Sequence, residues 1–453
     1  MTRRPLVLGA RAALVAGLAL TTAATTVPAA QASHPFDPAQ QTSLSLRVYT
    51  ERVKPIGTAG GVQVRGDGYG SAVVPVPGHK DQVYGLTDRG PNVDGPDGSK
   101  IEPFQGFVPS IGKFTLKKDG SAKLVKRIKL RAKDGTPYNG QVNAQASTGE
   151  TITDLNGKVL PASPYGYDSE GLVALKDGTF WVSDEYGPFI THFDKRGRAI
   201  KRLSPFDGTL PRELALRTPN RGMEGLTITP DGRTLVGIMQ SALTQSDAGK
   251  PKSVAVTRIV TVDLKTKQTR EYAYVLDNPK ELGTAVSEIA ALSATRFVVD
   301  ERDGELGPTA VKKLYEVDLA DATDVGPRTT AGTYDPTTGV RLGGKSLEAV
   351  AGTGDTAATT TALTTAGVTP VAKKLYLDLG ALTRAAAPGG TFFDHDKIEG
   401  VAVLDGGRKI IVSNDSDFGI GDSSGDAAPF GLVAKTRPDG SVDDGQFLVI
   451  DRH

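Results

Sequence analysis

The sequence predicts an all-β protein, a β-propeller of about six four-stranded blades, with five or seven blades as alternatives. Apolar runs are short, rich in β-branched residues and bounded by turn dipeptides such as Asp177-Gly178 and Asp231-Gly232. A short phrase, a glutamate with a small residue and then an apolar run, also recurs roughly every 50–65 residues. A repeat of short strands at that interval is typical of sheets arranged radially around one axis.

The repeated phrase marks where each blade begins. The glutamates of the clear copies are Glu170, Glu224, Glu288 and Glu399, and a looser copy holds Glu348. In most copies a turn and a second strand follow, and that strand ends in acid. These endings are Asp184-Glu185, Asp300-Glu301 and Asn414-Asp415. We expect a further blade around residues 71–130, and a sixth that uses Glu348 and an outer strand at 374–377.

Residues 1–32 are predicted to be a cleaved signal peptide. Arg3 and Arg4 precede an apolar stretch at 12–20, and Ala30-Gln31-Ala32 offers a cleavage site before Ser33. The paired arginines fit either a twin-arginine signal or an ordinary one. No other apolar stretch approaches the length of a membrane-spanning helix. The sequence therefore predicts a secreted protein without a membrane span.

The mature chain is expected to form a single propeller domain over residues 55–453, with loop insertions near 131–166 and 352–369. Residues 33–54 form an N-terminal segment whose strand at 44–49 is a candidate to close the ring. The chain has no cysteine, so core burial and bound metal are the expected sources of stability. A net charge of +1 excludes a basic surface for nucleic acid. We expect a monomer that binds a small molecule.

The acids of different blades are expected to meet at one rim. Adjacent antiparallel strands have opposite ends on one face, so a glutamate that starts one strand lies beside the acid that ends the next. A rim of carboxylate oxygens suits Ca²⁺. The ligands expected from this geometry are Glu170, Glu224, Glu288, Glu399 and Asp415. The alternative is that each glutamate caps its own blade by accepting backbone N–H bonds.

Basic residues recur beside these acids. They are Arg89, Arg221, Arg302 and Lys397. Cations interleaved with metal-binding carboxylates would suit a phosphate group, which a metal and arginines can hold together. The other interpretation is that the same residues form local ion pairs that stabilise the rim.

Several of these segments together resemble the phytase-like family, which is described as having an esterase-like activity of phytase type. The segments that carry the resemblance are Thr87–Pro91, Glu170–Leu172, Trp181–Pro188, Met223–Leu226, Glu288–Leu292, Lys397–Val401 and Asn414-Asp415. The resemblance covers about residues 55–435 and implies a β-propeller. By looser kinship with alkaline propeller phytases, it also implies a calcium-dependent phosphomonoesterase. The chain lacks the dense Lys/Arg cluster expected for phytate, and its Glu348 copy is degraded.

The function predicted from the sequence is a secreted, calcium-dependent hydrolase of phosphate esters acting at the channel mouth. Candidate catalytic residues are Asp184, Glu185, Asp300 and Glu301, which would activate an attacking water. One alternative is a metal-dependent hydrolase of lactones or carboxyl esters. The other is a non-enzymatic, calcium-stabilised propeller that binds a ligand or a protein.

Overall fold

Strands dominate this protein, and five four-stranded groups of them are arranged around a common centre. The computed structural model describes residues 44–146, 149–389 and 392–452, which belong to one compact unit. The predicted signal peptide, residues 1–32, lies outside the described residues. The predicted all-β class is confirmed.

Each group begins with an inner strand and continues outward through three more strands. The first holds β4 (Ala72–Pro75), β5 (Gln82–Leu86), β8 (Ser110–Leu116) and β9 (Ser121–Lys129). The second holds β12 (Ser169–Ala174), β13 (Phe180–Asp184), β14 (Ile190–Phe193) and β15 (Ala199–Leu203). The third holds β16 (Met223–Ile228), β17 (Thr234–Met239), β18 (Val256–Asp263) and β19 (Thr269–Val275). The fourth holds β20 (Ala285–Ala291), β21 (Arg296–Arg302), β22 (Lys312–Asp318) and β26 (Ala372–Asp378). The fifth holds β27 (Ile398–Leu404), β28 (Lys409–Asn414), β31 (Gln446–Arg452) and β1 (Leu44–Arg52).

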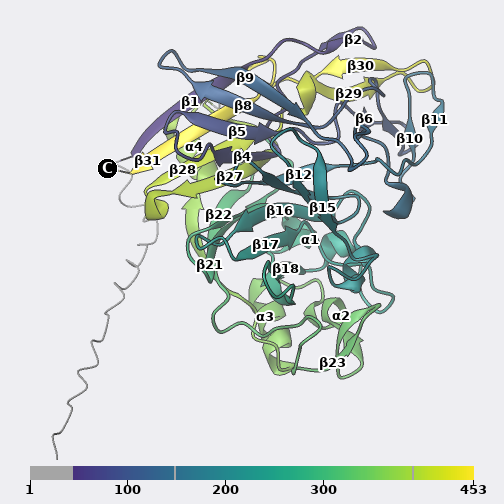
Figure 1. The fold of residues 1–453 in the computed structure, drawn as a ribbon, viewed down its shortest axis with the longest axis vertical. Helices are drawn as coiled ribbons and strands as arrows, with labels where there is room; N and C mark the ends of the chain where they lie inside the picture. The colour runs from purple at the N-terminus through teal and green to yellow at the C-terminus, as the bar shows by residue number, and fades with distance from the viewer. Residues whose placement is uncertain (1–43, 147–148, 390–391, 453) are drawn as a thin grey trace, which may run out of the picture. The chain divides into compact units, whose positions relative to one another are not determined.

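The inner strands close into a propeller-like ring. β12 lies beside β16, β16 beside β20, β20 beside β27, β27 beside β4, and β4 beside β12. In Figure 1 the labels of β4, β12, β16 and β27 gather near the middle, with the later strands of each group further out. The two ends of the described chain meet in the fifth group, where β1 pairs antiparallel with β31. β1 also pairs in parallel with β9, which joins the fifth group to the first.

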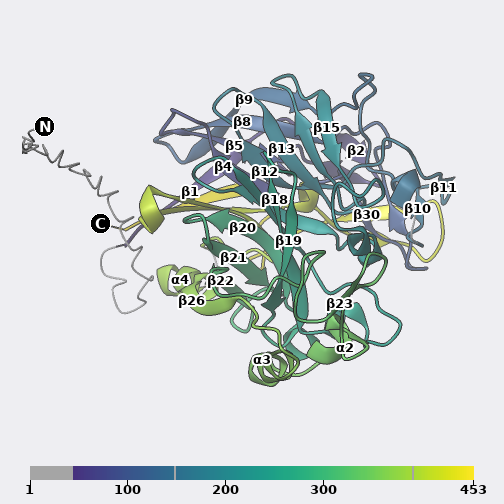
Figure 2. The same cartoon turned by 60° about the horizontal axis from the view of Figure 1, so that its bottom comes forward.

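The sixth blade expected at Glu348 is not found in the described residues. Ser346 instead caps helix α2 (Leu347–Ala351) by accepting a hydrogen bond from the Ala349 nitrogen at 3.1 Å. The outer strand expected at 374–377 is part of β26 in the fourth group. The predicted loop at 352–369 contains helix α3 (Thr356–Thr365). Figures 1 and 2 show α2 near β23 (Thr333–Asp335), and α3 packs against α2.

The insertion at 131–166 contributes β10 (Ile152–Thr153) and β11 (Val159–Leu160) to a small sheet with β6 (Val93–Asp94) and β7 (Lys100–Ile101). The other short strands are β2 (Gly57–Ala59), β3 (Val62–Val64), β24 (Gly339–Leu342), β25 (Lys345–Ser346), β29 (Ile420–Ser424) and β30 (Gly431–Ala434). The remaining α-helices are α1 (Pro279–Leu282) and α4 (Leu379–Ala386). Among the described residues, no helix combines the length and the apolar character that crossing a membrane requires.

A β-bulge near the start of the inner strand selects which residue faces the centre. In β16 the register passes from Met223↔Met239 to Gly225↔Ile238, so Glu224 is the additional residue. Glu170 in β12 and Glu399 in β27 lie in equivalent bulges. In β20 the additional residue is Ser287, because Val286↔Glu301 is followed by Glu288↔Asp300. Glu288 therefore occupies the position that is glycine in the other three strands.

These glycines allow neighbouring inner strands to approach closely. A Cβ atom at Gly225 would lie 2.6 Å from the Ile289 nitrogen. At Gly400 it would lie 2.2 Å from Ser413 Oγ and 2.5 Å from the Val73 nitrogen. The backbone of one group thus packs directly against the next, and this contact fixes the position of each bulge relative to its neighbours.

We predict that Gly400→Ala lowers the free energy of unfolding by about 1–3 kcal/mol, because the added methyl group overpacks this contact. Gly106→Ala is the matched control, because a Cβ atom there meets nothing within 4 Å. Urea denaturation of both variants measures the difference. Equal stability of the two variants would show that the inner strands can separate at no cost.

Candidate functional site

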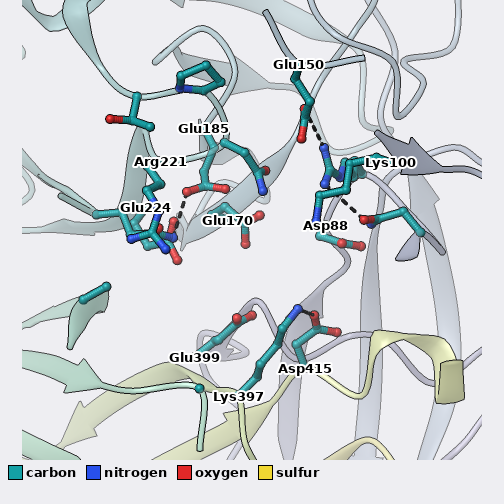
Figure 3. Close-up of a pocket in the computed structure, with 18 of the residues that line it drawn as sticks. Asp88, Lys100, Glu150, Glu170, Glu185, Arg221, Glu224, Lys397, Glu399 and Asp415 are labelled. Carbon is teal, nitrogen blue, oxygen red and sulfur yellow. Dashed lines mark hydrogen bonds and ion pairs between the residues drawn. The ribbon is translucent and has the colours of Figure 1, made fainter. Parts of the chain in front are cut away.

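A cavity of about 610 Å³ lies at the centre of the ring, and all five groups of strands contribute to its wall. Its acidic lining residues are Asp88, Asp94, Glu150, Glu170, Glu185, Glu224, Glu399 and Asp415. Its basic lining residues are Arg89, Lys100, Arg221, Lys252, Arg302 and Lys397. Figure 3 shows Glu170, Glu185 and Glu224 on one side of this space, with Glu399, Lys397 and Asp415 facing them from the other.

Two positions of the repeat supply much of this lining. The first is the bulge of the inner strand, which provides Glu170, Glu224 and Glu399. The second is the end of the adjacent strand, which provides Asp88, Glu185, Gln240, Arg302 and Asp415. Antiparallel pairing brings the two positions to one end of the ring. The first group has no glutamate in its inner strand, so it contributes through Asp88 alone at these positions.

The tightest acidic group consists of Asp168, Glu170 and Glu185. Each offers a carboxylate oxygen, these oxygens lie within 4.8 Å of one another, and all three side chains are buried. Asp168 accepts a hydrogen bond from the Arg89 nitrogen at 3.1 Å and lies 3.8 Å from Arg89 Nε. Neither Glu170 nor Glu185 forms an ion pair within the described part of the chain. This group is therefore poorly neutralised by the protein's own cations.

The side-chain amide of Asn220 lies against two of these acids. With its nitrogen toward them, it donates to Asp168 Oδ2 at 2.8 Å and to Glu185 Oε2 at 3.1 Å. With its oxygen toward them, the same side chain adds a further oxygen atom to the group. Asn220 holds this place with a positive φ of 54°, a conformation that asparagine adopts more readily than most residues. It is thus a neutral polar partner that suits either state of the carboxylates.

Crowding and burial raise the pKa values of these acids. Burial, followed by the charges of Asp168 and Glu224, raises the pKa of Glu170 well above its usual value. Burial raises the pKa of Asp168 as well. For Glu185, burial and then the charge of Glu224 raise the pKa well above the usual value. Burial is also the main cause that raises the pKa of Glu224 to about 7. Several acids here must therefore hold a proton or meet an added positive charge at neutral pH.

The donor set of this group fits a hard divalent cation. The atoms available are carboxylate and amide oxygens, which Ca²⁺ and Mg²⁺ prefer. The chain has no cysteine, and no histidine is among the described residues that line the cavity, so a zinc or copper site does not fit. Glu224 Oε2 is buried without a hydrogen-bond partner among the described residues. It provides one further free oxygen beside the group.

The opposite wall differs because its acids are paired with cations. Arg302 Nη2 lies 2.6 Å from Glu399 Oε1, and its Nε donates to Ser287 Oγ at 2.9 Å. Lys397 Nζ lies 3.5 Å from Asp415 Oδ2 and also contacts Asp417. Arg302 and Lys397 thus form the local ion pairs that were the second interpretation of the basic residues.

Of the other two predicted basic residues, Arg89 forms an ion pair in the described part of the chain and Arg221 does not. Arg89 Nη1 lies 3.1 Å from Glu150 Oε2, and the guanidinium also contacts the Tyr186 hydroxyl. Arg221 lines the cavity, but its guanidinium has no hydrogen-bond or ion-pair partner within the described residues. Burial lowers the pKa of Arg221, and the charge of Arg221 in turn lowers the pKa of nearby Lys252. Neither side chain forms an ion pair within the described residues, although Glu185 and Glu224 lie near enough to Arg221 to act on its pKa.

Glu288 and Asp300, both predicted from the sequence as site residues, do not reach the cavity. Glu288 Oε1 accepts hydrogen bonds from the Leu226 and Ile289 nitrogens, both at 2.9 Å. It therefore caps backbone between two inner strands, which is the structural alternative considered above. Asp300 pairs with Glu288 across the sheet and is fully buried, and burial raises the pKa of both acids well above their usual values.

Asp184 and Glu301 are also absent from the cavity lining. Asp184 accepts hydrogen bonds from the Tyr186 nitrogen at 2.8 Å and the Asp168 nitrogen at 3.2 Å. Glu301 accepts from the Tyr274 hydroxyl and from Lys373 Nζ, both at 2.7 Å. The expectation that these acids gather at the rim with the others is therefore wrong, because each stands one residue before the position that faces the cavity.

Three residues of the site, Asp168, Asp88 and Asn220, were not predicted from the sequence. Asp168 stands two residues before Glu170, at the start of the same repeat, and Asp88 stands one residue before Arg89. Their place beside these predicted residues was a usable signal. Asn220 belongs to no repeated phrase, and only the folded chain brings it to the acids.

Comparisons with known proteins place the chain among relatives of largely undefined activity. An uncharacterized secreted protein from Arthroderma benhamiae is 30% identical, over 42% of this chain and 46% of the relative. The chain thus matches less than half of that relative's length. Pseudomonas fluorescens PhoX, solved with vanadate as a transition-state analogue, has 10% identity and a TM-score of 0.34, covering 93% of this chain and 97% of PhoX. An inactive virginiamycin B lyase from Staphylococcus aureus has 11% identity and a TM-score of 0.28, and the match covers 89% of this chain and 99% of the lyase.

Structural likeness at these TM-scores carries no argument about activity. The sequence profile of a known family is more informative, because it matches residues 68–418, well over half of the chain. That span includes every residue of the acidic group and both walls of the cavity. The chain belongs to the phytase-like family, which is described by the esterase-like activity of phytase.

Proposed function

We propose that this protein hydrolyses phosphate esters in the central cavity with the help of bound Ca²⁺. The observation that carries the proposal is the buried group of Asp168, Glu170 and Glu185, whose oxygens lie within 4.8 Å of one another. Glu170 and Glu185 of this group line a cavity that Arg221, whose guanidinium has no ion pair within the described residues, also lines. Membership of the phytase-like family supports hydrolysis of an ester. A small-molecule substrate fits a cavity of about 610 Å³.

Asp168, Glu170 and Glu185 are the residues that would hold the cation, with Asn220 beside them. Glu224, Glu399 and Asp415 line the same cavity and could supply further oxygen atoms. A bound divalent cation supplies neutralisation of phosphate charge and a lowered pKa for a coordinated water. Glu288 is not part of this proposal, because its carboxylate is engaged by backbone nitrogens.

Arg221 and Lys252 would bind and orient the phosphate group. Neither forms an ion pair within the described residues, whereas Arg89, Arg302 and Lys397 are held by Glu150, Glu399 and Asp417. A guanidinium without a protein partner can donate two parallel hydrogen bonds to phosphate oxygens. Of the four basic residues predicted from the sequence, Arg221 is therefore the one most available to substrate.

Glu224 would move the proton that hydrolysis requires. Its pKa is raised to about 7, so both protonation states are populated near neutral pH. Its Oε2 atom is buried without a partner among the described residues and can accept a proton from attacking water. The new P–O bond forms to that water, the ester P–O bond breaks, and the leaving oxygen takes up a proton. No protein nucleophile is needed for this route.

We also propose that the protein is exported. The signal peptide predicted at residues 1–32 is the main argument, and the relative named as a secreted protein supports it. Extracellular Ca²⁺ would then be available to the acidic group.

The most direct functional prediction concerns Glu170→Gln. We expect turnover of p-nitrophenyl phosphate to fall by roughly 100-fold or more, because the substitution removes a charged oxygen ligand. Chelation of Ca²⁺ should abolish wild-type turnover, and Glu281→Gln, a change at an exposed side chain, should have no effect. Turnover of p-nitrophenyl acetate but not of the phosphate would favour a carboxyl-ester hydrolase. No turnover of either ester, with a melting temperature that still rises on adding Ca²⁺, would favour a binding protein.

A second prediction separates substrate binding from cation binding. Arg221→Met should lower kcat/KM for the phosphate ester about 10- to 100-fold, mainly by raising KM, because it removes the free cation that meets the phosphate. The Ca²⁺ affinity of Arg221→Met, measured by calorimetry, should not be weaker than that of the wild-type protein. Lys250→Met, at an exposed position outside the cavity lining, is the control. An unchanged KM for Arg221→Met would exclude the assigned role.

The raised pKa values predict that Ca²⁺ binding releases protons. At about pH 6 Glu224 is largely protonated, and the pKa values of Asp168, Glu170 and Glu185 are raised as well. The cation must therefore displace protons, and its affinity should rise with pH. Without cation, the folded state binds more protons than the unfolded chain between the usual pKa of 4.5 and about 7, so stability should fall as pH rises through that range. Titration calorimetry in buffers of different protonation enthalpy measures the release. Binding without proton release, together with a pH-independent melting temperature, would contradict the account.

A further inference from the structure

A second cavity of about 610 Å³ shares no lining residue with the first. Its wall combines strands β8 and β9 of the first group with the segment before β2 and the loop that precedes β8. Thr87 lines this cavity, and the next residue, Asp88, lines the candidate active site. The two spaces therefore lie on opposite sides of one stretch of backbone.

Aromatic side chains form much of the second cavity. Phe104, Phe107, Phe418 and Tyr69 all contribute to its lining. Phe107 and Phe418 meet edge to face, with ring centroids 5.1 Å apart. Phe418 and Tyr69 are buried, whereas Phe104 and Phe107 are only partly buried. Partly buried aromatic rings around a cavity offer faces and edges to another aromatic ring.

The polar groups of this lining are few and specific. The Tyr69 hydroxyl and Ser110 Oγ are 3.2 Å apart and satisfy each other. The charged lining residues are Lys54, Arg127 and Lys129, and no aspartate or glutamate accompanies them. Within the described chain, none of these three cations forms an ion pair, and Arg127 lies 5.8 Å from the centre of the Tyr69 ring. An aromatic cavity with an uncompensated positive rim favours a ligand that is both aromatic and anionic.

We propose that this second cavity binds a small aromatic anion, a ring system carrying one carboxylate, sulfonate or phosphate group. The ring packs among Phe104, Phe107 and Phe418, and the anionic group meets Arg127 and the neighbouring lysines. The volume falls within the range of small-molecule sites. The inference does not depend on the hydrolase proposal, since the two cavities have different linings and opposite electrostatic character.

The test uses 1-naphthoate and its uncharged analogue of similar shape, 1-naphthamide, titrated calorimetrically into the full protein. We expect one naphthoate site per chain, with an affinity for naphthoate roughly tenfold or more above that for the amide, because only the acid meets the positive rim. Leu124→Glu places a negative charge in the cavity and should weaken naphthoate binding by a similar factor. Val125→Glu, at the next residue of β9, is the matched control, because Val125 is 49% exposed and does not line the cavity.

Three results would overturn the proposal. They are equal affinities for acid and amide, naphthoate binding that survives Leu124→Glu in a folded variant, and no binding of naphthoate at millimolar concentration. Should Leu124→Glu fail to fold, the double variant Arg127→Gln/Lys129→Gln carries the same expectation, because both side chains are exposed. Arg221→Met should leave naphthoate binding unchanged. If this variant lost naphthoate binding, the ligand would be bound in the candidate active site and not in the second cavity.

Discussion

The crowding of buried carboxylates at the centre of the ring is the constraint on which the rest of the site depends. Acids this close and this far from water cannot all be ionised unless positive charge accompanies them. On one wall the chain supplies that charge itself, through Arg302 beside Glu399 and Lys397 beside Asp415. On the other wall Glu170 and Glu185 have no such partner among the described residues. An external cation would therefore stabilise the protein most at the wall that holds Glu170 and Glu185.

The fold produces this crowding through small backbone features. Glycines such as Gly225 and Gly400 let the inner strands approach closely, and the adjoining bulge turns Glu224 or Glu399 toward the centre. Where glutamate replaces the glycine, as at position 288, its carboxylate caps backbone and leaves the centre. A one-residue change of phase thus converts a site residue into a structural one. On the adjacent strand, Arg302 holds the same cavity-facing position as Glu185 and Asp415, and Asp300 lies two residues before it.

Much of the fold and part of the site could be predicted from the sequence. Strand periodicity and the turns at Asp177-Gly178 and Asp231-Gly232 correctly predicted the hairpins β12–β13 and β16–β17. The number of blades could not be predicted from the sequence. The segment expected to form a sixth blade contains two helices, whose first turns are capped by the side chains of Ser346 and Asp355. Glu170, Glu224 and Glu399 were found because glutamate and glycine recur together. Glu288 was grouped with them wrongly, since a repeated glutamate does not show on which side of a bulge it lies.

The central claim is that Asp168, Glu170 and Glu185 share a divalent cation. Crystals grown with Ca²⁺ and measured at long wavelength would test it through anomalous difference density. The account predicts a peak within coordination distance of oxygen atoms from all three side chains. Diffraction that shows no peak at saturating Ca²⁺, or a peak only at sites outside the cavity, would contradict it.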